Sequence, residues 1–299
     1  EYYSLINMKK ITFILILLLG FYNMGQAQLF WKVSGNNLKK PSYILGTSHF
    51  TSVTFCDSIS GFKKAFNSTK QFYGEVSSAD LANIEASMKI QKMELLPDNQ
   101  SLADFYTPEE YEQVLQYTES ILGYRPGMIA FTPKALYLFF TAQLYLKYLP
   151  QSLETEFIDM GLAQMAKEAG KQIGGLETAE SQIDLLWGGD LKEQAAQLLE
   201  YIQDPASSKD SIVNECLRID KAYRDQDLNQ LSLMIKQSFN PEEYKECITD
   251  RNVAWIPIME EAMKKCSTFF AVGAGHLVDE VGLIRLLREK GYTVEPVKK

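Results

Sequence analysis

The chain contains only two histidines, His49 and His276, and both end the same short pattern. Gly46–His49 reads Gly-Thr-Ser-His and Gly273–His276 reads Gly-Ala-Gly-His, each after an apolar run. Imidazole is the commonest side-chain ligand for divalent metals and titrates near neutral pH, so two converging copies could hold a metal or share acid–base work. The alternative is two unrelated loop histidines. Because the whole Gly-x-x-His context repeats with the histidine, the sequence favours a shared site.

Each histidine is predicted to follow a β-strand. The runs Leu29–Ser34 and Ser42–Leu45 flank a Gly/Asn turn and predict a hairpin whose end delivers His49. The end of the chain predicts a β-α-β unit of a parallel sheet, with His276 at the carboxyl end of its first strand. Its elements are expected at Ser267–Val272, Gly273–His276, Glu280–Lys290 and Tyr292–Val297. In open α/β sheets, ligands bind at this edge.

Two carboxylates are predicted at strand ends as well. The segment Gln71–Val76 alternates and places Glu75 on a strand or at its end, and Lys171–Leu176 is a predicted strand that delivers Glu177. Two imidazoles and a carboxylate, with a fourth position left to water, form a known catalytic arrangement for zinc. Two other interpretations stay open: Glu75 as an exposed or salt-bridged strand residue, and Glu177 as an N-terminal acid of the following helix.

Most of the remaining chain has helical patterns. Thr107 as N-cap and Pro108 at the first helical position predict the start of a helix. A second helix is predicted from Pro133 to Tyr148. Its apolar stripe of Leu, Tyr and Phe side chains is expected to pack in the core or to line a ligand site. Asp250 is expected to cap a helix. The other helices are expected at Asp57–Asn67, Glu154–Ala169, Asp190–Gln203, Ser208–Arg224, Asp227–Gln237 and Asp250–Lys265. These elements predict an α/β fold: a mixed, partly parallel β-sheet with flanking helices and a large helical insertion over about 78–170.

The first segment has the pattern of an export signal. Met8 is followed by two lysines, the apolar run Ile11–Phe21 and small residues before Ala27, which predicts a secretory signal peptide cleaved between Ala27 and Gln28. A membrane anchor is the alternative, but the run is short for a span and no second apolar segment of spanning length follows. Residues 1–7 precede the methionine and take no part in this interpretation. We therefore expect residues 1–27 to be removed, and residues 28–299 to form one exported domain, periplasmic or secreted, without a membrane span.

Charge and cysteine content exclude several classes. The chain has a net charge of −8 at pH 7 and no basic cluster, so nucleic acid is not an expected partner. The spacing of its four cysteines includes no C-x-x-C, so a zinc ribbon or thioredoxin-like motif is not expected. A helix between Cys247 and Cys266 would hold those two too far apart to bond. Free thiols are expected at Cys56, Cys216, Cys247 and Cys266, with a bond between Cys216 and Cys247 as the alternative.

The combination of these residues resembles the TraB/GumN family, which includes the Tiki proteins. The resemblance covers essentially all of residues 28–299 in the family's order, and Asp159 with Leu162 and Ala166 also fits its pattern. It rests on Gly46–His49, Glu75, Gly175–Thr178, Gln182, Arg251–Asn252 and Phe270–Leu277. Gly275 stands where bulkier residues are common, which puts only the local loop shape in doubt. The wider superfamily includes erythromycin-esterase-like hydrolases and ChaN-like haem-binding proteins, so the resemblance implies a fold more firmly than a reaction.

The resemblance also implies roles. His49, Glu75 and His276 match the family's presumed metal and catalytic positions. On this basis we hypothesise that Glu177 is the general base or orients a ligand, and that Arg251 stabilises an oxyanion. The other signature positions are Gly46, Gln182, Asn252 and Gly273. Since the Tiki branch is described as metal-dependent peptidases, we expect a hydrolase with a divalent cation (Zn, Mn or Co) and a peptide or other cell-envelope substrate. Two alternatives remain: metal-free, esterase-like hydrolysis with one histidine as base, and a binding protein that holds haem, a metal or a cell-envelope ligand without turnover.

Overall fold

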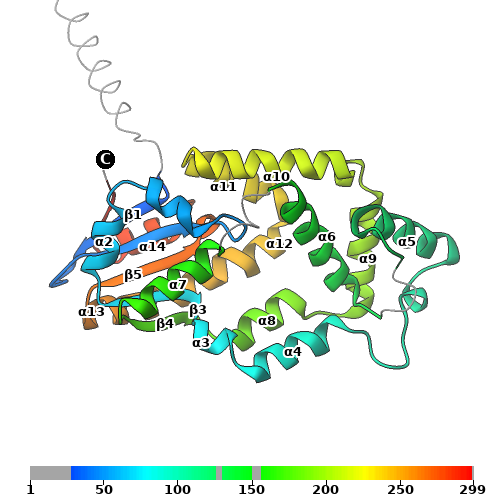
Figure 1. Cartoon of the computed structure of the whole chain (residues 1–299), viewed down its shortest axis with the longest axis horizontal. Helices are drawn as coiled ribbons and strands as arrows, with labels where there is room; N and C mark the ends of the chain where they lie inside the picture. Colours follow the sequence, from blue (N-terminus) through cyan, green and yellow to red (C-terminus); the bar gives the residue numbers. More distant parts are fainter. Residues whose placement is uncertain (1–27, 126–129, 150–155, 298–299) are drawn as a thin grey trace, which may run out of the picture.

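A six-stranded mixed β-sheet lies at one end of the molecule (Figure 1). The computed structural model describes residues 28–125, 130–149 and 156–297. The strands are β1 (Phe30–Gly35), β2 (Ser42–Thr47), β3 (Gln71–Val76), β4 (Gln172–Glu177), β5 (Thr268–Gly273) and β6 (Tyr292–Pro296). The strand order is β4-β3-β5-β2-β1-β6. Strand β5 pairs in parallel with β2 and β3, and β3 pairs in parallel with β4. Strand β1 is antiparallel to both its neighbours, β2 and β6. The predicted mixed, partly parallel sheet is confirmed.

The predicted hairpin and the C-terminal unit are both present, with one difference. The β1–β2 turn uses left-handed backbone at Gly35, Asn36 and Asn37, which Gly and Asn adopt most easily. After β5, the chain forms the turn η6 (Ala274–His276) and α14 (Leu283–Glu289). However, β6 pairs with β1 rather than with β5, so this connection passes two intervening strands.

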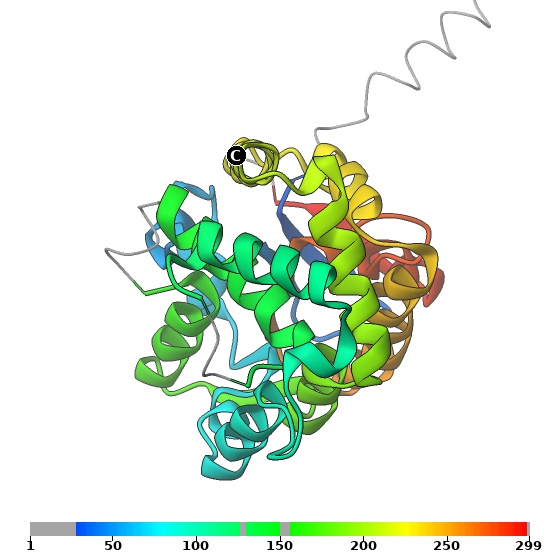
Figure 2. The same ribbon diagram turned by 90° about the vertical axis from the view of Figure 1, so that its right-hand side faces the viewer.

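Helices cover the sheet and also build a wholly helical part of the molecule, at the right of Figure 1 and in front in Figure 2. The helices are α2 (Phe62–Ser68), α3 (Ser78–Leu81), α4 (Ile84–Glu94), α5 (Pro108–Leu122), α6 (Pro133–Tyr148), α7 (Ile158–Glu168), α8 (Ala179–Trp187), α9 (Leu191–Gln203), α10 (Lys209–Arg224), α11 (Leu228–Ser238), α12 (Pro241–Tyr244) and α13 (Arg251–Lys265). Shorter turns are the 3-10 helices η1 (Val53–Ser58), η2 (Leu102–Phe105) and η4 (Pro205–Ser207), and η5 (Lys245–Asp250) is a π-helix. Strand β5 is buried at its first five positions, as expected for a strand covered on both faces. Helix α7 contacts β3, β4 and β5, and α13 contacts β4.

The helical part has a hydrophobic core of its own. Val114 of α5, Phe140 of α6 and Leu198 of α9 belong to one buried cluster that is separate from the cluster around the sheet. The apolar stripe of α6 therefore packs in this second core, which is one of the two roles predicted for it. The start of α5 is also confirmed, with a capping box between Thr107 and Glu110 and proline at the first position.

Two helix predictions need correction. The segment predicted as one helix over Asp57–Asn67 is η1 followed by α2, because extended backbone at Ile59 ends η1 and Gly61, with φ +77°, precedes the first residue of α2. The prediction that Asp250 caps a helix was wrong: its backbone is helical, and its carboxylate pairs with Lys245. No glycine or proline follows Pro241 before Arg251, so α12, η5 and α13 run on as one helical segment.

All four cysteines are free thiols, as predicted, and the alternative bond between Cys216 and Cys247 is not formed. The predicted signal peptide lies in residues 1–27, outside the described residues. Within the described part of the chain, no helix is long and apolar enough to span a bilayer.

Candidate active site

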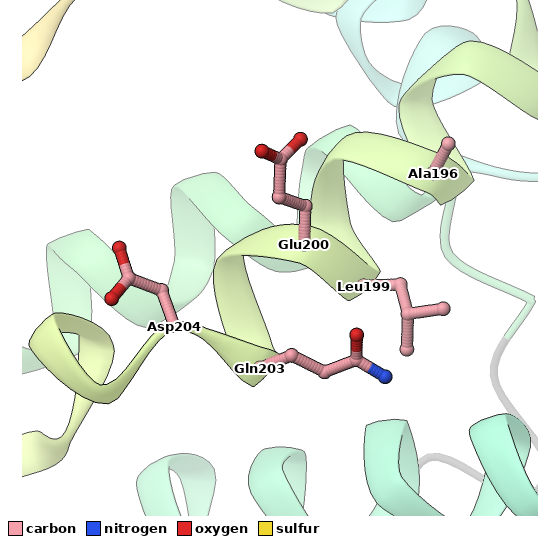
Figure 3. Close-up of a pocket in the computed structure, with 5 residues that line it drawn as sticks. All are labelled: Ala196, Leu199, Glu200, Gln203 and Asp204. Carbon is pink, nitrogen blue, oxygen red and sulfur yellow. The ribbon is translucent and has the colours of Figure 1, made fainter.

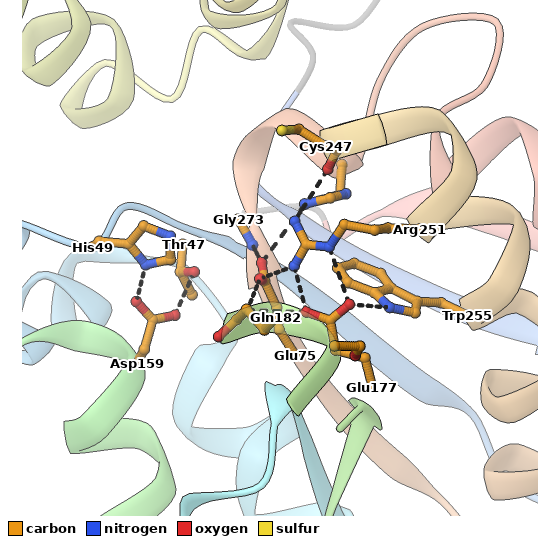
Figure 4. A network of polar contacts seen from close by, with 12 residues as sticks. Thr47, His49, Glu75, Asp159, Glu177, Gln182, Cys247, Arg251, Trp255 and Gly273 are labelled. Atoms are coloured by element: carbon orange, nitrogen blue, oxygen red, sulfur yellow. Dashed lines mark hydrogen bonds and ion pairs between the residues drawn. The ribbon is translucent and has the colours of Figure 1, made fainter. Parts of the chain in front are cut away.

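Most of the candidate residues meet at the carboxyl ends of the parallel strands (Figure 4). Those on strands are Thr47 at the end of β2, Glu75 in β3, Glu177 at the end of β4 and Gly273 at the end of β5. The parallel registers between β2 and β5 and between β3 and β4 align these ends. Arg251 opens α13, and His276 ends the turn η6 that follows β5.

Arg251 forms a partly buried ion-pair cluster with Glu75 and Glu177. Its Nη2 donates to Glu75 Oε2 at 2.6 Å and to Glu177 Oε1 at 2.7 Å, and its Nε donates to Glu177 Oε2 at 3.1 Å. The three side chains are 15, 12 and 11 % exposed, in the order Arg251, Glu75, Glu177. The remaining nitrogen, Nη1, donates to the carbonyl of Cys247 and lies 3.1 Å from His276 Nε2. All five guanidinium N–H groups therefore have partners, and none is free for an oxyanion in this arrangement.

Two more side chains bind the same carboxylates. Gln182 donates to Glu75 Oε2 at 3.2 Å and to Glu177 Oε1 at 3.0 Å. Trp255 Nε1 donates to Glu177 Oε2 at 3.3 Å, and the guanidinium of Arg251 lies 4.7 Å from the centre of its ring. Because both oxygens of Glu177 are occupied by donors, its geometry fits a residue that orients Arg251 better than a general base.

His276 is buried, and its hydrogen bonds define its protonation. Asn252 Nδ2 donates to the carbonyls of His276 and Val281, so its Oδ1 is the atom that faces His276 Nδ1 at 2.7 Å. An amide oxygen can only accept, so Nδ1 carries the proton and Nε2 keeps a lone pair, directed at Arg251. Burial lowers the pKa of His276 to about 4, with the charge of Arg251 acting in the same direction and that of Glu75 opposing it. The imidazole is therefore neutral at pH 7.

Glu75 is the charged counterpart of this neutral ring. Burial alone would raise the pKa of its carboxyl, but His276, which is protonated at the low pH where Glu75 titrates, outweighs burial together with the charges of Arg251 and His49. The N–H of Gly273 also donates to Oε1 at 2.8 Å. Together they hold the pKa of Glu75 at about 2. Its Oε1 lies 3.8 Å from His276 Nε2, so two groups of the predicted metal set do converge.

His49 belongs to a second group of contacts, beside the first in Figure 4. Its Nδ1 lies 2.8 Å from Asp159 Oδ2, and the other carboxylate oxygen accepts from Thr47 Oγ1 at 2.6 Å. The imidazole is 67 % exposed, and among the described residues none hydrogen-bonds to its Nε2. The charge and the hydrogen bond of Asp159 raise the pKa of His49 to about 9, so this ring is a cation at pH 7.

The donors of a metal site are present, but they are not gathered around one point. Across the described residues, no three His, Cys, Asp or Glu side chains are grouped so as to hold a metal. Glu75 and His276 converge, whereas His49 pairs with Asp159, and Arg251 hydrogen-bonds to the lone pair of His276 Nε2. The chemistry of the donors nevertheless fits a divalent cation. Both imidazoles are held at Nδ1 by a side-chain oxygen, which is how metal-binding histidines are oriented.

The two predicted signature glycines sit where backbone approaches closely. A Cβ on Gly46 would lie 2.8 Å from Leu277 Cδ1 and 3.1 Å from Ala274 Cα, so glycine lets β2 pack directly on the turn that carries His276. A Cβ on Gly273 would lie 3.3 Å from Glu75 Oε1. Both glycines therefore belong to the walls of the site.

One connected network thus contains Glu75, Glu177, Gln182, Arg251, Asn252, Gly273 and His276, all predicted from the sequence. Two contributors were not assigned to the site. Trp255 lies four positions after Arg251, on the same face of α13, and this spacing could have indicated it. Asp159 matched the family pattern, but no local signal connects it with His49.

A surface hollow lies elsewhere, on α9. It measures about 440 Å³ and is lined by Ala196, Leu199, Glu200, Gln203 and Asp204 (Figure 3). It contains neither an imidazole nor a guanidinium, so it offers no chemistry comparable to that at the strand ends.

Comparison with known proteins identifies the family of the chain. A sequence model of the TraB/PrgY/gumN family matches residues 29–296. The chain belongs to this family. Its relatives include metalloprotease TIKI2 of Danio rerio, 24 % identical over 89 % of this chain and 60 % of the relative, and metalloprotease TIKI1 of Homo sapiens, 25 % identical over 85 % and 59 %. The chain thus spans about 60 % of the length of these relatives. No solved structure matches the chain significantly.

Proposed function

We propose that this member of the TraB/PrgY/gumN family is a metal-dependent hydrolase that cleaves peptide bonds, with a divalent cation held by His49, Glu75 and His276. The observation that carries the proposal is shared by the two histidines: an oxygen acceptor holds each ring at Nδ1, which leaves Nε2 as the ligand atom. Binding of the cation would displace the Nε2 proton of His49 and the hydrogen bond from Arg251 to His276 Nε2. The distant relationship to proteins named metalloproteases supports the same reaction class. When bound, the cation would polarise the scissile carbonyl and acidify a water molecule.

Residues of the chain would orient the groups at the site and balance their charges. Asn252 keeps the proton of His276 on Nδ1, and Glu75 supplies a carboxylate 3.8 Å from Nε2. Arg251 balances the charge of Glu75 and Glu177 and holds both carboxylates in place. Since its N–H groups all have partners, any contact of Arg251 with substrate would require one of these bonds to open.

Metal-free hydrolysis is less well supported by this geometry. A general base needs a free lone pair and a pKa near the working pH. His276 has a pKa of about 4, and its lone pair faces Arg251; His49 has a pKa of about 9 and is protonated at pH 7. Neither imidazole meets both requirements unless the arrangement changes.

Export remains part of the proposal, since the pattern of residues 8–27 is that of a signal peptide. The substrate would then be a peptide or another component of the cell envelope.

Metal content and turnover test the function together. Purified protein should contain, or bind, close to one equivalent of Zn²⁺, Mn²⁺ or Co²⁺, and it should cleave members of a peptide library. Chelation should abolish cleavage, and addition of the metal should restore it. His49→Ala and His276→Ala should weaken metal binding and abolish the activity, whereas the surface variant Gln164→Ala should leave both unchanged. Unchanged cleavage after exhaustive chelation would overturn the proposal, and a stably bound metal without cleavage would instead favour a binding protein.

A further inference from the structure

Asp159, at the second position of α7, bridges two residues at the end of β2. Its Oδ2 binds His49 Nδ1 at 2.8 Å, and its Oδ1 accepts from Thr47 Oγ1 at 2.6 Å. Since Thr47 and His49 are separated by one residue, the carboxylate contacts both the last residue of the strand and the histidine that follows it. A carboxylate held at both oxygens has little freedom to rotate.

Backbone contacts fix the start of α7 against the same loop. The N–H of Ile158 donates to the carbonyl of Thr51 at 2.8 Å, and the N–H of Val53 donates to the carbonyl of Glu156 at 3.0 Å. One turn further along, a Cβ on Gly161 would lie 2.5 Å from Val53 Cβ, so the helix packs as closely as glycine allows. The position of the Asp159 carboxylate relative to His49 is therefore set by main-chain bonds and packing as well as by its own hydrogen bonds.

Asn252 has the matching position at the other histidine. It binds His276 Nδ1 at 2.7 Å, and its own amide is held by two carbonyls. Asp159 and Asn252 come from different helices, α7 and α13, yet each contacts the same ring atom of its histidine. The two acceptors differ in charge, but they place the histidines in the same way.

We propose that Asp159 is a positioning residue for His49: it keeps the proton on Nδ1 and holds the ring so that Nε2, on the side away from Asp159, is the nitrogen that contacts a ligand. The role of Nε2 as a metal ligand rests on the proposed function, whereas the positioning of the ring does not. Asp159 acts through His49 and does not itself contact the substrate or the cation.

The presence of only two histidines makes the ring directly observable. In the chain labelled with ¹⁵N-histidine, we expect a slowly exchanging Nδ1–H signal from His49. It should persist in Asp159→Asn, which keeps an acceptor oxygen, and vanish in Asp159→Ala. Asp57→Asn is the matched control, because this exposed carboxylate pairs with Lys63, away from His49, and the substitution should leave the signal unchanged. If the signal survives in folded Asp159→Ala, the positioning role is wrong.

The affinity for Zn²⁺ alone provides the second measurement. Asp159→Ala should weaken binding about 10- to 100-fold, as loss of such an orienting partner does elsewhere. Asp159→Asn should retain most of the affinity, and Asp57→Asn all of it. Once His49→Ala is present, adding Asp159→Ala should cause no further loss, because Asp159 acts through the ring.

The two measurements separate the inference from the proposed function. Losses in affinity that add in the double variant would show that Asp159 acts independently of His49 and would overturn the inference. If wild-type protein binds no Zn²⁺ while the ring signal behaves as expected, the positioning role stands and the proposed function fails.

Discussion

The two Gly-x-x-His units have the same spacing and the same place at a strand end, but opposite environments. His276 is buried, neutral and held by the amide of Asn252, whereas His49 is exposed, cationic and held by the carboxylate of Asp159. The pKa of the first ring is lowered to about 4 by burial, and that of the second is raised to about 9 by Asp159. The repeated motif therefore determines where a ring is placed, while burial determines the charge of His276 and the partner Asp159 determines that of His49.

The largest expected effect concerns the charges that surround the neutral ring. Arg251→Gln would leave Glu75 and Glu177, which are 12 and 11 % exposed, without a cation, and the loss should approach the cost of breaking a fully buried pair, about 3–5 kcal/mol. Urea denaturation of the metal-free protein measures the loss. The control is Arg125→Gln, which removes a guanidinium 46 % exposed and paired with Glu112 and Glu119, and should cost less than about 1 kcal/mol. Equal losses in the two variants would show that the cluster at the strand ends is not effectively buried.

Removing each ring in turn tests the comparison directly. His276→Ala would leave a cavity beside Trp255, whose ring centre is 4.4 Å away, and a buried oxygen of Asn252 without its donor; we expect a loss of about 2–4 kcal/mol. His49→Ala removes an exposed ring whose ion pair with Asp159 is screened by solvent, and it should cost less than His276→Ala. Both variants should lose hydrolysis if the proposed function is right. Similar stability losses in urea denaturation would contradict the difference in burial between the two rings.

These contrasts also define what local sequence patterns could predict. The sequence predicted that Glu75, Glu177 and His276 lie close together, because the last residues of parallel strands meet at one edge of the sheet. The contact between Arg251 and Glu75 joins residues 176 apart in the sequence, and only the family pattern connected them. For His49 and Asp159, 110 residues apart, neither periodicity nor spacing indicates the pair, since it depends on how α7 docks on the loop after β2.

The prediction about Asp250 failed for a related reason. An aspartate before a helical pattern is a good capping signal only where a helix begins, and the chain before Asp250 is itself helical through η5. The π-helix ends directly before Arg251. Irregular helices of this kind are common at functional sites, but their position follows from tertiary packing rather than from residue propensity.

Replacing the carboxylate of Asp159 with an amide should make the pKa values of the two histidines more alike. In Asp159→Asn, His49 would keep a hydrogen-bond acceptor but lose the neighbouring negative charge, so its pKa should fall from about 9 towards its ordinary value. The pKa of His276 should stay low, because burial is its main cause. Two-site NMR titration of the metal-free protein resolves both rings. A pKa of His49 that does not move would mean that Asp159 is not the source of its charge.

The smallest effect is expected in the pH dependence of stability. The folded-state pKa of His276 is about 4, below the ordinary 6.5, so the stability it contributes at higher pH is lost as the pH falls from 6.5 to 4. The folded-state pKa of Glu75 is about 2, below the ordinary 4.5, so its contribution is lost as the pH falls from 4.5 to 2. His49 has the opposite sign: its pKa is raised from 6.5 to about 9, so its contribution is present below 6.5 and is lost as the pH rises to 9. Unfolding midpoints measured with a chelator present should therefore decline on both sides. In His49→Ala the alkaline decline between pH 6.5 and 9 should disappear while the acid limb stays; an alkaline decline of unchanged size would show that another group, and not the pair with Asp159, titrates there.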